Sequence, residues 1–171
     1  MVEHASWKQL NGATVGQYHL QRLLDQHPWG PIFLANDSSN QAYTVRFIGM
    51  PASPDQADLP AEYRLVYLGR FQQAANQLAS LQHQHILPLL DYGSYQETPY
   101  LVSPYQKLTS LRSVLKSTPA LDSITVGRLL KQLVEALSYA HTHGILHRNL
   151  STLCIFTRPD YQLVISDFGK L

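Results

Sequence analysis

Two short segments near the end of the chain carry residue types that could do chemistry. Residues 147–150 read His-Arg-Asn-Leu, and residues 167–169 read Asp-Phe-Gly. They bring together an imidazole, a guanidinium, an amide and a carboxylate. Asn149 can hydrogen-bond a hydroxyl group, but an amide is not a useful general base near pH 7. The chemistry open to Asn149 is therefore hydrogen bonding, not proton abstraction.

Metal-binding patterns are weak in this sequence. Cys154 is the only cysteine, so an intramolecular disulfide is impossible and a cysteine-based metal cluster is not expected. Of the eight histidines, His83 and His85 lie two positions apart, as do His141 and His143. Zinc-binding histidines on one helix face lie four apart, so this spacing does not favour zinc. We expect Cys154 to be a small buried residue.

The composition excludes several classes of partner. The formal net charge is +1 and there is no run of lysine and arginine, so we expect no nucleic-acid partner. No stretch approaches the roughly 18 apolar residues needed to span a bilayer, so we expect no membrane segment in this chain. The first ten residues lack the apolar run of a signal peptide, and a cytoplasmic location is the default expectation.

The first half of the chain has the pattern of a small antiparallel sheet. β-branched and aromatic residues favour strands at 18–24, 32–35 and 41–48, with turn-forming residues between them at 25–28 and 36–40. Two further strands are expected at 86–92 and 100–104. Residues 50–60 carry three prolines and are expected to form a loop.

Amphipathic helices separate and follow these strands. One helix is expected to end near Leu81, and the clearest helix spans 123–143, with Asp122 or Ser123 as its N-cap and Gly144 after its end. A short helix near 109–116 and a hairpin of 154–156 with 162–165 complete the order. This order predicts an α+β fold and not a doubly wound parallel sheet.

The order of elements and the two motifs together resemble the protein kinase fold, most closely the bacterial Ser/Thr branch. In that family a His-Arg-Asp-Leu loop follows a long amphipathic helix, and Asp-Phe-Gly follows the next hairpin. The resemblance implies an antiparallel β-sheet N-lobe and a truncated, mainly helical C-lobe. The implied boundaries are an N-terminal arm over 1–17, the N-lobe over 18–104, and a partial C-lobe over 105–171 that ends just after Asp-Phe-Gly.

On this alignment three groups of the catalytic loop are changed. Asn149 stands where the family has its catalytic Asp, and Ser151 stands where it has a Lys. Cys154 replaces the Asn that holds a second magnesium ion, and a soft sulfur is a poor ligand for this hard ion. Asp167 keeps the place of the metal-binding Asp and could hold one magnesium.

The phosphate-binding parts are changed as well. Of the three glycine positions between the first two strands only Gly30 is retained, and Asp25 and His27 stand at the other two. We therefore interpret this segment as a tight strand-to-strand turn, with a phosphate-binding loop as the alternative. Arg46 replaces the phosphate-holding Lys, and the position of its Glu partner falls on Ala74. We therefore expect Arg46 to be exposed, and the alternative is that it holds a phosphate as the family's Lys does.

The resemblance also assigns a nucleotide pocket. Ile32 fits its roof, Thr44 stands where Ala is usual, and Ser103 is at the gatekeeper position. Phe156 occupies a floor position usually held by a smaller aliphatic residue. Tyr105 is assigned to the same pocket.

These changes predict a pseudokinase-like regulatory or scaffolding module that lacks efficient phosphoryl transfer. The alternative is a weak, divergent ATP-dependent serine/threonine kinase that uses Asp167 with one magnesium ion. We expect no cofactor, the alternative being ATP with Mg²⁺ at low affinity. Leu129, Leu133 and Leu137 are expected to expose apolar surface, covered by a protein partner or by the missing C-terminal part of the same domain.

Overall fold

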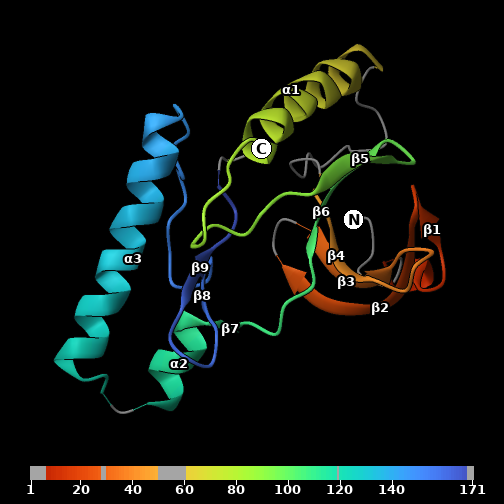
Figure 1. Ribbon diagram of the computed structural model, residues 1–171. Coiled ribbons are helices and arrows are strands. Elements are labelled where there is room, and N and C mark those ends of the chain that lie inside the picture. Colours follow the sequence, from red (N-terminus) through yellow and green to blue (C-terminus); the bar gives the residue numbers. More distant parts are fainter. Residues whose placement is uncertain (1–6, 28–29, 50–60, 119, 169–171) are drawn as a thin grey trace. The chain divides into compact units, whose positions relative to one another are not determined.

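A computed structural model describes residues 7–27, 30–49, 61–118 and 120–168, and the chain forms two compact units (Figure 1). The first unit contains the chain as far as Asn76 together with Leu89–Tyr105. The second contains Gln77–Pro88 and the chain from Gln106 onward. The second unit therefore includes a short segment whose neighbours in sequence, on both sides, belong to the first.

The first unit is built on one antiparallel sheet with the strand order β1-β2-β3-β4-β6-β5. The meander predicted for the first three long strands is confirmed. The strands are β1 (Thr14–Val15), β2 (Tyr18–His27), β3 (Gly30–Asn36), β4 (Ala42–Phe47), β5 (Asp91–Tyr95) and β6 (Thr98–Pro104).

Two expected strand boundaries are wrong. The first long strand was expected to break at Asp25, but β2 continues to His27 because Asp25 pairs with Ile32 and His27 with Gly30. Cross-strand pairing outweighs the local turn preference there. The strand expected at 86–92 is also displaced, because Ile86 makes only an isolated bridge to Ile165 and β5 begins at Asp91.

One face of this sheet carries an aromatic core. Phe47 is fully buried, and its ring centroid lies 5.9 Å from that of Phe33 and 6.2 Å from that of Tyr100. Trp7 opens a short 3₁₀ helix, η1 (Trp7–Leu10), and its ring lies 5.7 Å from Phe47. Part of the arm expected over residues 1–17 is thus packed on the sheet, and the buried Val15 pairs with Tyr18.

The first unit also includes most of a long helix, α1 (Ala61–Ala79). Phe71 and Ala75 are buried beside Ile48, and Leu89 and Leu101 pack against this small cluster. The loop expected at 50–60 lies outside the described residues.

The second unit combines two helices and a three-stranded sheet of order β7-β8-β9. Asp122 caps the long helix, because its Oδ1 accepts the Thr125 N–H at 2.9 Å, and Gly144 follows the helix with a positive φ of 73°. The predicted cap, terminator and hairpin are therefore confirmed. The elements are β7 (Thr109–Ser110), α2 (Leu111–Ser117), α3 (Ser123–Thr142), β8 (Ile155–Thr157) and β9 (Leu163–Ile165).

The helix α3 runs along the β8–β9 hairpin (Figure 1) and buries one stripe against it. Leu129, Ala136 and Ala140 lie in this core with Ile165. A buried polar residue, Gln132, joins the two elements by accepting the backbone N–H of Leu163 at 2.6 Å.

The apolar surface expected on α3 involves other residues than those predicted. Leu129 is buried, and Leu133 and Leu137 are partly buried. The exposed apolar side chains of this helix are Ile124, Val126, Leu130 and Val134. Among the described helices, none is both long enough and apolar enough to cross a membrane.

Candidate active site

Four residues assigned to the nucleotide site lie on one face of the first unit's sheet. The side chains of Phe33, Val45 and Val102 point into the buried core, so the side chains next to them along each strand lie on the opposite face of the sheet. Ile32 is directly opposite Arg46, and Thr44 is directly opposite Ser103. The structure thus brings together the partly buried side chains Ile32, Thr44, Arg46 and Ser103.

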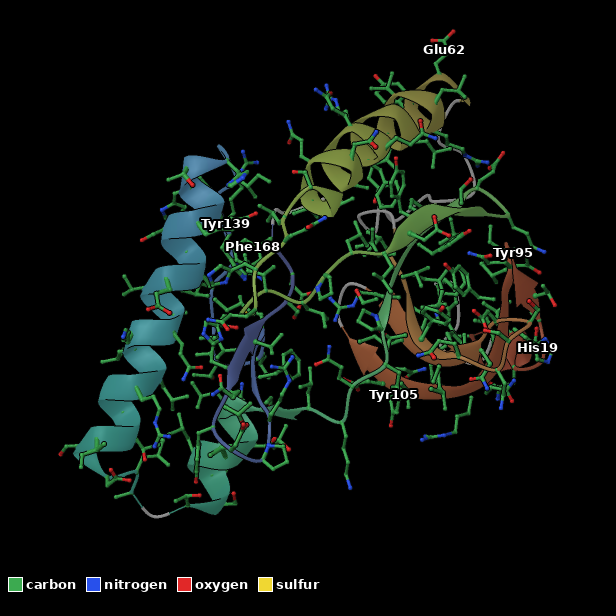
Figure 2. All side chains as sticks on the ribbon, viewed as in Figure 1. His19, Glu62, Tyr95, Tyr105, Tyr139 and Phe168 are labelled. Atoms are coloured by element: carbon green, nitrogen blue, oxygen red, sulfur yellow. The ribbon has the colours of Figure 1, made fainter. Side chains whose placement is uncertain are left out.

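The Thr44 side chain is engaged within the sheet. Its Oγ1 donates a hydrogen bond to the Ser103 carbonyl oxygen at 3.2 Å. The hydroxyl that replaces the usual Ala methyl group is therefore satisfied locally. Tyr105, just beyond β6, is exposed, and its backbone N–H donates to the Ala42 carbonyl at 3.2 Å (Figure 2).

Gly30 is required by the backbone around it. Its φ is 134°, and a Cβ atom built there would lie 2.1 Å from the Phe47 carbonyl oxygen. The β2–β3 ladder continues to the pair His27–Gly30, so the two strands stay paired up to the expected turn. The turn residues 28–29 lie outside the described part of the chain. The retained glycine has a structural explanation that needs no bound phosphate.

The expectation that Arg46 is exposed is wrong, because its side chain is partly buried on the sheet face. Arg46 lies between the buried Val45 and Phe47 on β4, so its side chain is on the opposite face of the sheet. Its partners in the strand pairing are Ile32 on β3 and Leu101 on β6. In α1 the expected position of a carboxylate partner holds Ala74, which is partly buried.

The carboxylate of α1 is at the other end of the helix. Glu62 lies in its first turn and is exposed (Figure 2). Arg64, two residues further on, makes an ion pair with Glu97 at 2.6 Å. The described part of α1 therefore has no carboxylate at position 74, where the family has the Glu that pairs with its phosphate-holding Lys.

In the second unit His147 ties the two motif loops together. The ring is buried, and its Nε2 lies 2.8 Å from the Ser166 carbonyl oxygen. A carbonyl only accepts, so Nε2 carries the proton, and Nδ1 accepts the Asn149 N–H at 3.4 Å. The ring centroids of His147 and Phe168 are 4.7 Å apart, and Phe168 is part of the core (Figure 2).

Leu78 of α1 packs against the cluster that contains Phe168. Leu89 packs against the separate cluster of the first unit that contains Phe71. His147 and Phe168 are thus retained as packing residues of the second unit.

The side chains of Asn149 and Ser151 are exposed, whereas Cys154 is buried. The Cys154 Sγ lies 3.1 Å from the Ser151 carbonyl oxygen and accepts the Ser151 N–H at 3.1 Å. Burial raises the pKa of the Cys154 thiol, but the neighbouring His147 side chain and hydrogen bonds with Ser151 outweigh burial, and the pKa is lowered from its ordinary value. The predicted burial of Cys154 is confirmed.

Asp167 lies in a strained loop. Its φ is 63° and that of Arg148 is 62°, a backbone region that residues with a side chain rarely adopt. Such strain gathers at functional sites. The Ser166 hydroxyl donates to Asp167 Oδ2 at 3.0 Å, a contact that the sequence analysis missed. A hydroxyl residue directly before the carboxylate was the available signal.

The described residues fit one magnesium ion better than two. The Asp167 carboxylate is a hard oxygen ligand, and Mg²⁺ is commonly held by one or two carboxylates with substrate phosphates. The Cys154 sulfur is soft and hydrogen-bonded within its own loop, so it does not suit a second magnesium. No group of three or more potential ligands from His, Cys, Asp and Glu gathers in the described parts of the chain.

Phe156, the expected pocket floor, is partly buried in β8 opposite Val164.

Comparison with known families decides what these elements are. Residues 62–170 match the protein kinase domain family. The chain belongs to this family. The expected α+β architecture, with an antiparallel sheet in the N-terminal part and few helices in the C-terminal part, is that of the protein kinase fold.

The curated relatives of this kinase-family chain are bacterial serine/threonine-protein kinases. PknA of Mycobacterium tuberculosis is 32% identical over 165 residues, which cover 92% of this chain and 36% of PknA. PknH of the same organism is 29% identical over 160 residues, which cover 92% of this chain and 24% of PknH. The chain therefore spans only about a quarter to a third of the length of these relatives.

Solved structures agree with the sequence match. The kinase domain of Mycobacterium tuberculosis PknI superimposes with a TM-score of 0.75 at 25% identity. The match covers 94% of this chain and 63% of the PknI chain. The kinase fold of the present chain is thus shown by sequence and by structure.

Proposed function

We propose that this kinase-family chain is a pseudokinase-like regulatory or scaffolding module that lacks efficient phosphoryl transfer. The observation that carries the proposal is Asn149, whose exposed amide stands where the family has its catalytic Asp. An amide cannot accept the substrate hydroxyl's proton, and loss of a positioned general base typically costs about 10²–10⁴-fold in rate.

Losses at other positions act in the same direction. Phosphoryl transfer depends chiefly on positioning and on charge stabilisation. Ser151 lacks the positive charge of the usual Lys, Cys154 is buried in loop hydrogen bonds, and Ala74 cannot pair with Arg46 through a carboxylate. These penalties need not add, but each removes a separate part of the machinery.

We also propose that nucleotide binds weakly at most. Asp25 and His27 lie in the β2–β3 ladder where the family has glycines whose amides approach phosphates, and Asp25 is exposed and acidic. The thermal midpoint of the chain is expected not to move in millimolar Mg-ATP. A rise of several degrees that is lost in Asp167→Asn contradicts this part of the proposal.

The second candidate function is a weak, divergent serine/threonine kinase. Asp167 favours it, because this carboxylate is retained in a strained loop and could hold one magnesium ion. The two functions differ in whether labelled γ-phosphate passes from ATP to protein in the presence of magnesium or manganese. Transfer that disappears in Asp167→Ala supports the kinase.

We propose that protein covers the apolar face of α3. Leu130 and Val134 are more than half exposed there, and Ile124 is 80% exposed. The cover is either a continuation of the same domain or a protein partner in the cytoplasm. Sedimentation of the chain alone tests this proposal. If the wild-type chain is a monomer at high concentration, and Leu130→Lys sediments in the same way, the exposed apolar face of α3 does not need a protein cover.

A further inference from the structure

The first turns of the helix α1 expose an apolar patch. Phe71 and Ala75 are buried, so the side of the helix opposite to them faces solvent. On and around that side Tyr63 is 67% exposed, Leu65 is 70% exposed and Val66 is 55% exposed. Single exposed apolar residues are ordinary on a protein surface, but three within one helical turn form a patch that a partner can cover.

Opposite charges lie at the two ends of this patch. Glu62 is four positions before Val66, and Arg70 is four positions after it. Residues four apart on a helix lie on the same face, so these three side chains form one row along α1. All three are exposed, and Figure 2 shows Glu62 pointing outward at the start of the helix. The row therefore has a negative end, an apolar centre and a positive end.

The two charges of the row have no counter-charge in the described part of the chain. Arg64, on another side of α1, is paired with Glu97. Among the residues that the structure describes, neither Glu62 nor Arg70 makes an ion pair of this kind. They cannot pair with each other within one helix, because eight residues separate them by about 12 Å along the helix axis. Both charges are thus available to a partner.

The row is complementary to a second copy of itself. When two copies of α1 meet antiparallel about a two-fold axis beside Val66, the second copy presents the row in reverse order. Glu62 of each copy then lies opposite Arg70 of the other, and the two Val66 side chains meet at the centre. Rows of this i, i+4 type become parallel when two helices cross at about −50°, which is the commonest crossing in globular proteins. The contact is isologous, so each ion pair forms twice.

The neighbours of the row leave room for this contact. Gly69 lies beside Val66, and nothing lies within 4 Å of a Cβ atom built on it. The backbone of a second helix can therefore come close to α1 at this point. Tyr63 and Leu65 lie on either side of the row, where a second helix covers part of their exposed apolar surface.

We propose that α1 is the contact surface of a weak antiparallel dimer of this chain, in which the row of Glu62, Val66 and Arg70 packs against the same row of a second copy. A second copy is the partner that the pattern fits, because opposite charges stand at equal distances from an apolar centre. One pair of helices buries less than the roughly 800 Å² per partner of a standard interface. The dimer is therefore expected to form only at high chain concentration.

Reversal of the two charges tests the pairing between copies. Sedimentation equilibrium at low salt, where exposed charges are screened least, measures the self-association constant. Glu62→Arg and Arg70→Glu each place like charges opposite one another at both ends of the contact. Each single variant is expected to weaken self-association about tenfold.

A mixture of the two single variants separates pairing between chains from effects within one chain. In a mixed dimer the reversed charge at position 62 of one chain faces the reversed charge at position 70 of the other, and the two native charges face each other at the opposite end. Every pair again has unlike charges. The equimolar mixture is therefore expected to associate about as strongly as the wild-type chain, although each variant alone does not.

The apolar centre has its own test and its own control. Val66→Lys brings two like charges together at the two-fold axis and is expected to abolish self-association. Leu115→Lys makes the same kind of change in α2, at a side chain that is 50% exposed, and is expected to behave as the wild-type chain. The series is repeated in a Leu130→Lys chain, so that association through the apolar face of α3 is not counted.

Any of three results overturns the dimer. The first is a wild-type chain that stays monomeric at millimolar concentration, which leaves the face of α1 to solvent or to a different protein. The second is a mixture of the two charge variants that associates no better than either alone. The third is self-association that is lost in Leu130→Lys but kept in Val66→Lys, which assigns the contact to α3 instead of α1.

Discussion

At Gly30 the backbone has a φ of 134°, and a Cβ atom would come within 2.1 Å of the Phe47 carbonyl oxygen. The same glycine is the one that survives from the phosphate-binding pattern of the kinase family. The position can be retained because the β2–β3 hairpin passes close to β4, whether or not a phosphate binds. A residue kept at a motif position is therefore weak support for the function of the motif.

This explanation predicts the effect of Gly30→Ala. The new methyl group meets backbone, which cannot move aside cheaply, and the free energy of unfolding is expected to fall by about 2 kcal/mol or more. Gly69→Ala in α1 is the matched control, because nothing lies within 4 Å of a Cβ atom there. The control is expected to gain up to about 1 kcal/mol from helix propensity. Urea unfolding measures both, and equal effects contradict the account.

Tyr18 predicts a pH effect in the first unit. Its hydroxyl donates to Asp91 Oδ2 at 3.0 Å, and burial, aided by Asp91, raises its pKa to about 12. The folded chain keeps this proton where the unfolded chain has lost it, so this contribution is full below pH 10 and is lost as pH rises towards 12. The slope is about 1.4 kcal/mol per pH unit in that window.

The measurement is chemical unfolding at pH 8 to 11.5 in the wild-type chain and in Tyr18→Phe. The variant is expected to lose this part of the alkaline slope, while Tyr63→Phe, at an exposed position, is expected to keep it. A Tyr18→Phe chain with the full wild-type slope contradicts the raised pKa.

Motif spacing located the candidate site residues, but it could not supply their environment. The pairing of Ile32 with Arg46 follows from strand alternation once the register is known. The partial burial of Arg46 and the contact between Ser166 and Asp167 depend on tertiary packing and on a strained loop. Such features leave no periodic trace in a sequence.

At the scale of elements, Gln132 connects α3 to the β8–β9 hairpin. Its Oε1 accepts the Leu163 N–H at 2.6 Å, and its Nε2 lies 3.4 Å from the Tyr161 carbonyl oxygen. The helical pattern predicted an apolar stripe but did not predict that the polar Gln132 is buried. Gln132 lies between Leu129 and Ala136 on the buried side of the helix.

Gln132→Ala is expected to lower the free energy of unfolding by about 2–3 kcal/mol, because it leaves the buried Leu163 N–H without its acceptor. Arg128→Ala, at an exposed position of the same helix, is expected to change it by less than about 0.5 kcal/mol. Thermal or urea unfolding distinguishes the two. A Gln132→Ala chain as stable as the Arg128→Ala chain means that Gln132 does not bridge the elements.

Elements with strong local signals were predicted well, and those that depend on partners were not. Asp122 and Gly144 bound α3 as expected because caps act locally. The extension of β2 through Asp25 depends on pairing with β3, and the short bridge at Ile86 depends on β9. Propensity alone cannot report partners that are distant in sequence.

At the scale of the whole molecule, the candidate site residues are divided between the two compact units. Arg46 and Ser103 belong to the first, and Asn149, Cys154 and Asp167 belong to the second. The kinase fold was predictable because its motifs and its order of elements agree. The lobe boundaries implied by the resemblance stay a prediction. The assignment of Gln77–Pro88 to the second unit could not be predicted, because no local sequence pattern marks this segment.

The central claim is that the kinase fold persists here without its phosphoryl-transfer chemistry. The most direct measurement is the radiolabel that purified chain transfers from γ-labelled ATP to itself and to a generic protein substrate, with magnesium and with manganese. The wild-type chain and Asp167→Ala are prepared and assayed side by side, so that contaminating kinases contribute equally to both. The account predicts equal, background incorporation in the two preparations. Incorporation by the wild-type chain that clearly exceeds that of Asp167→Ala contradicts it.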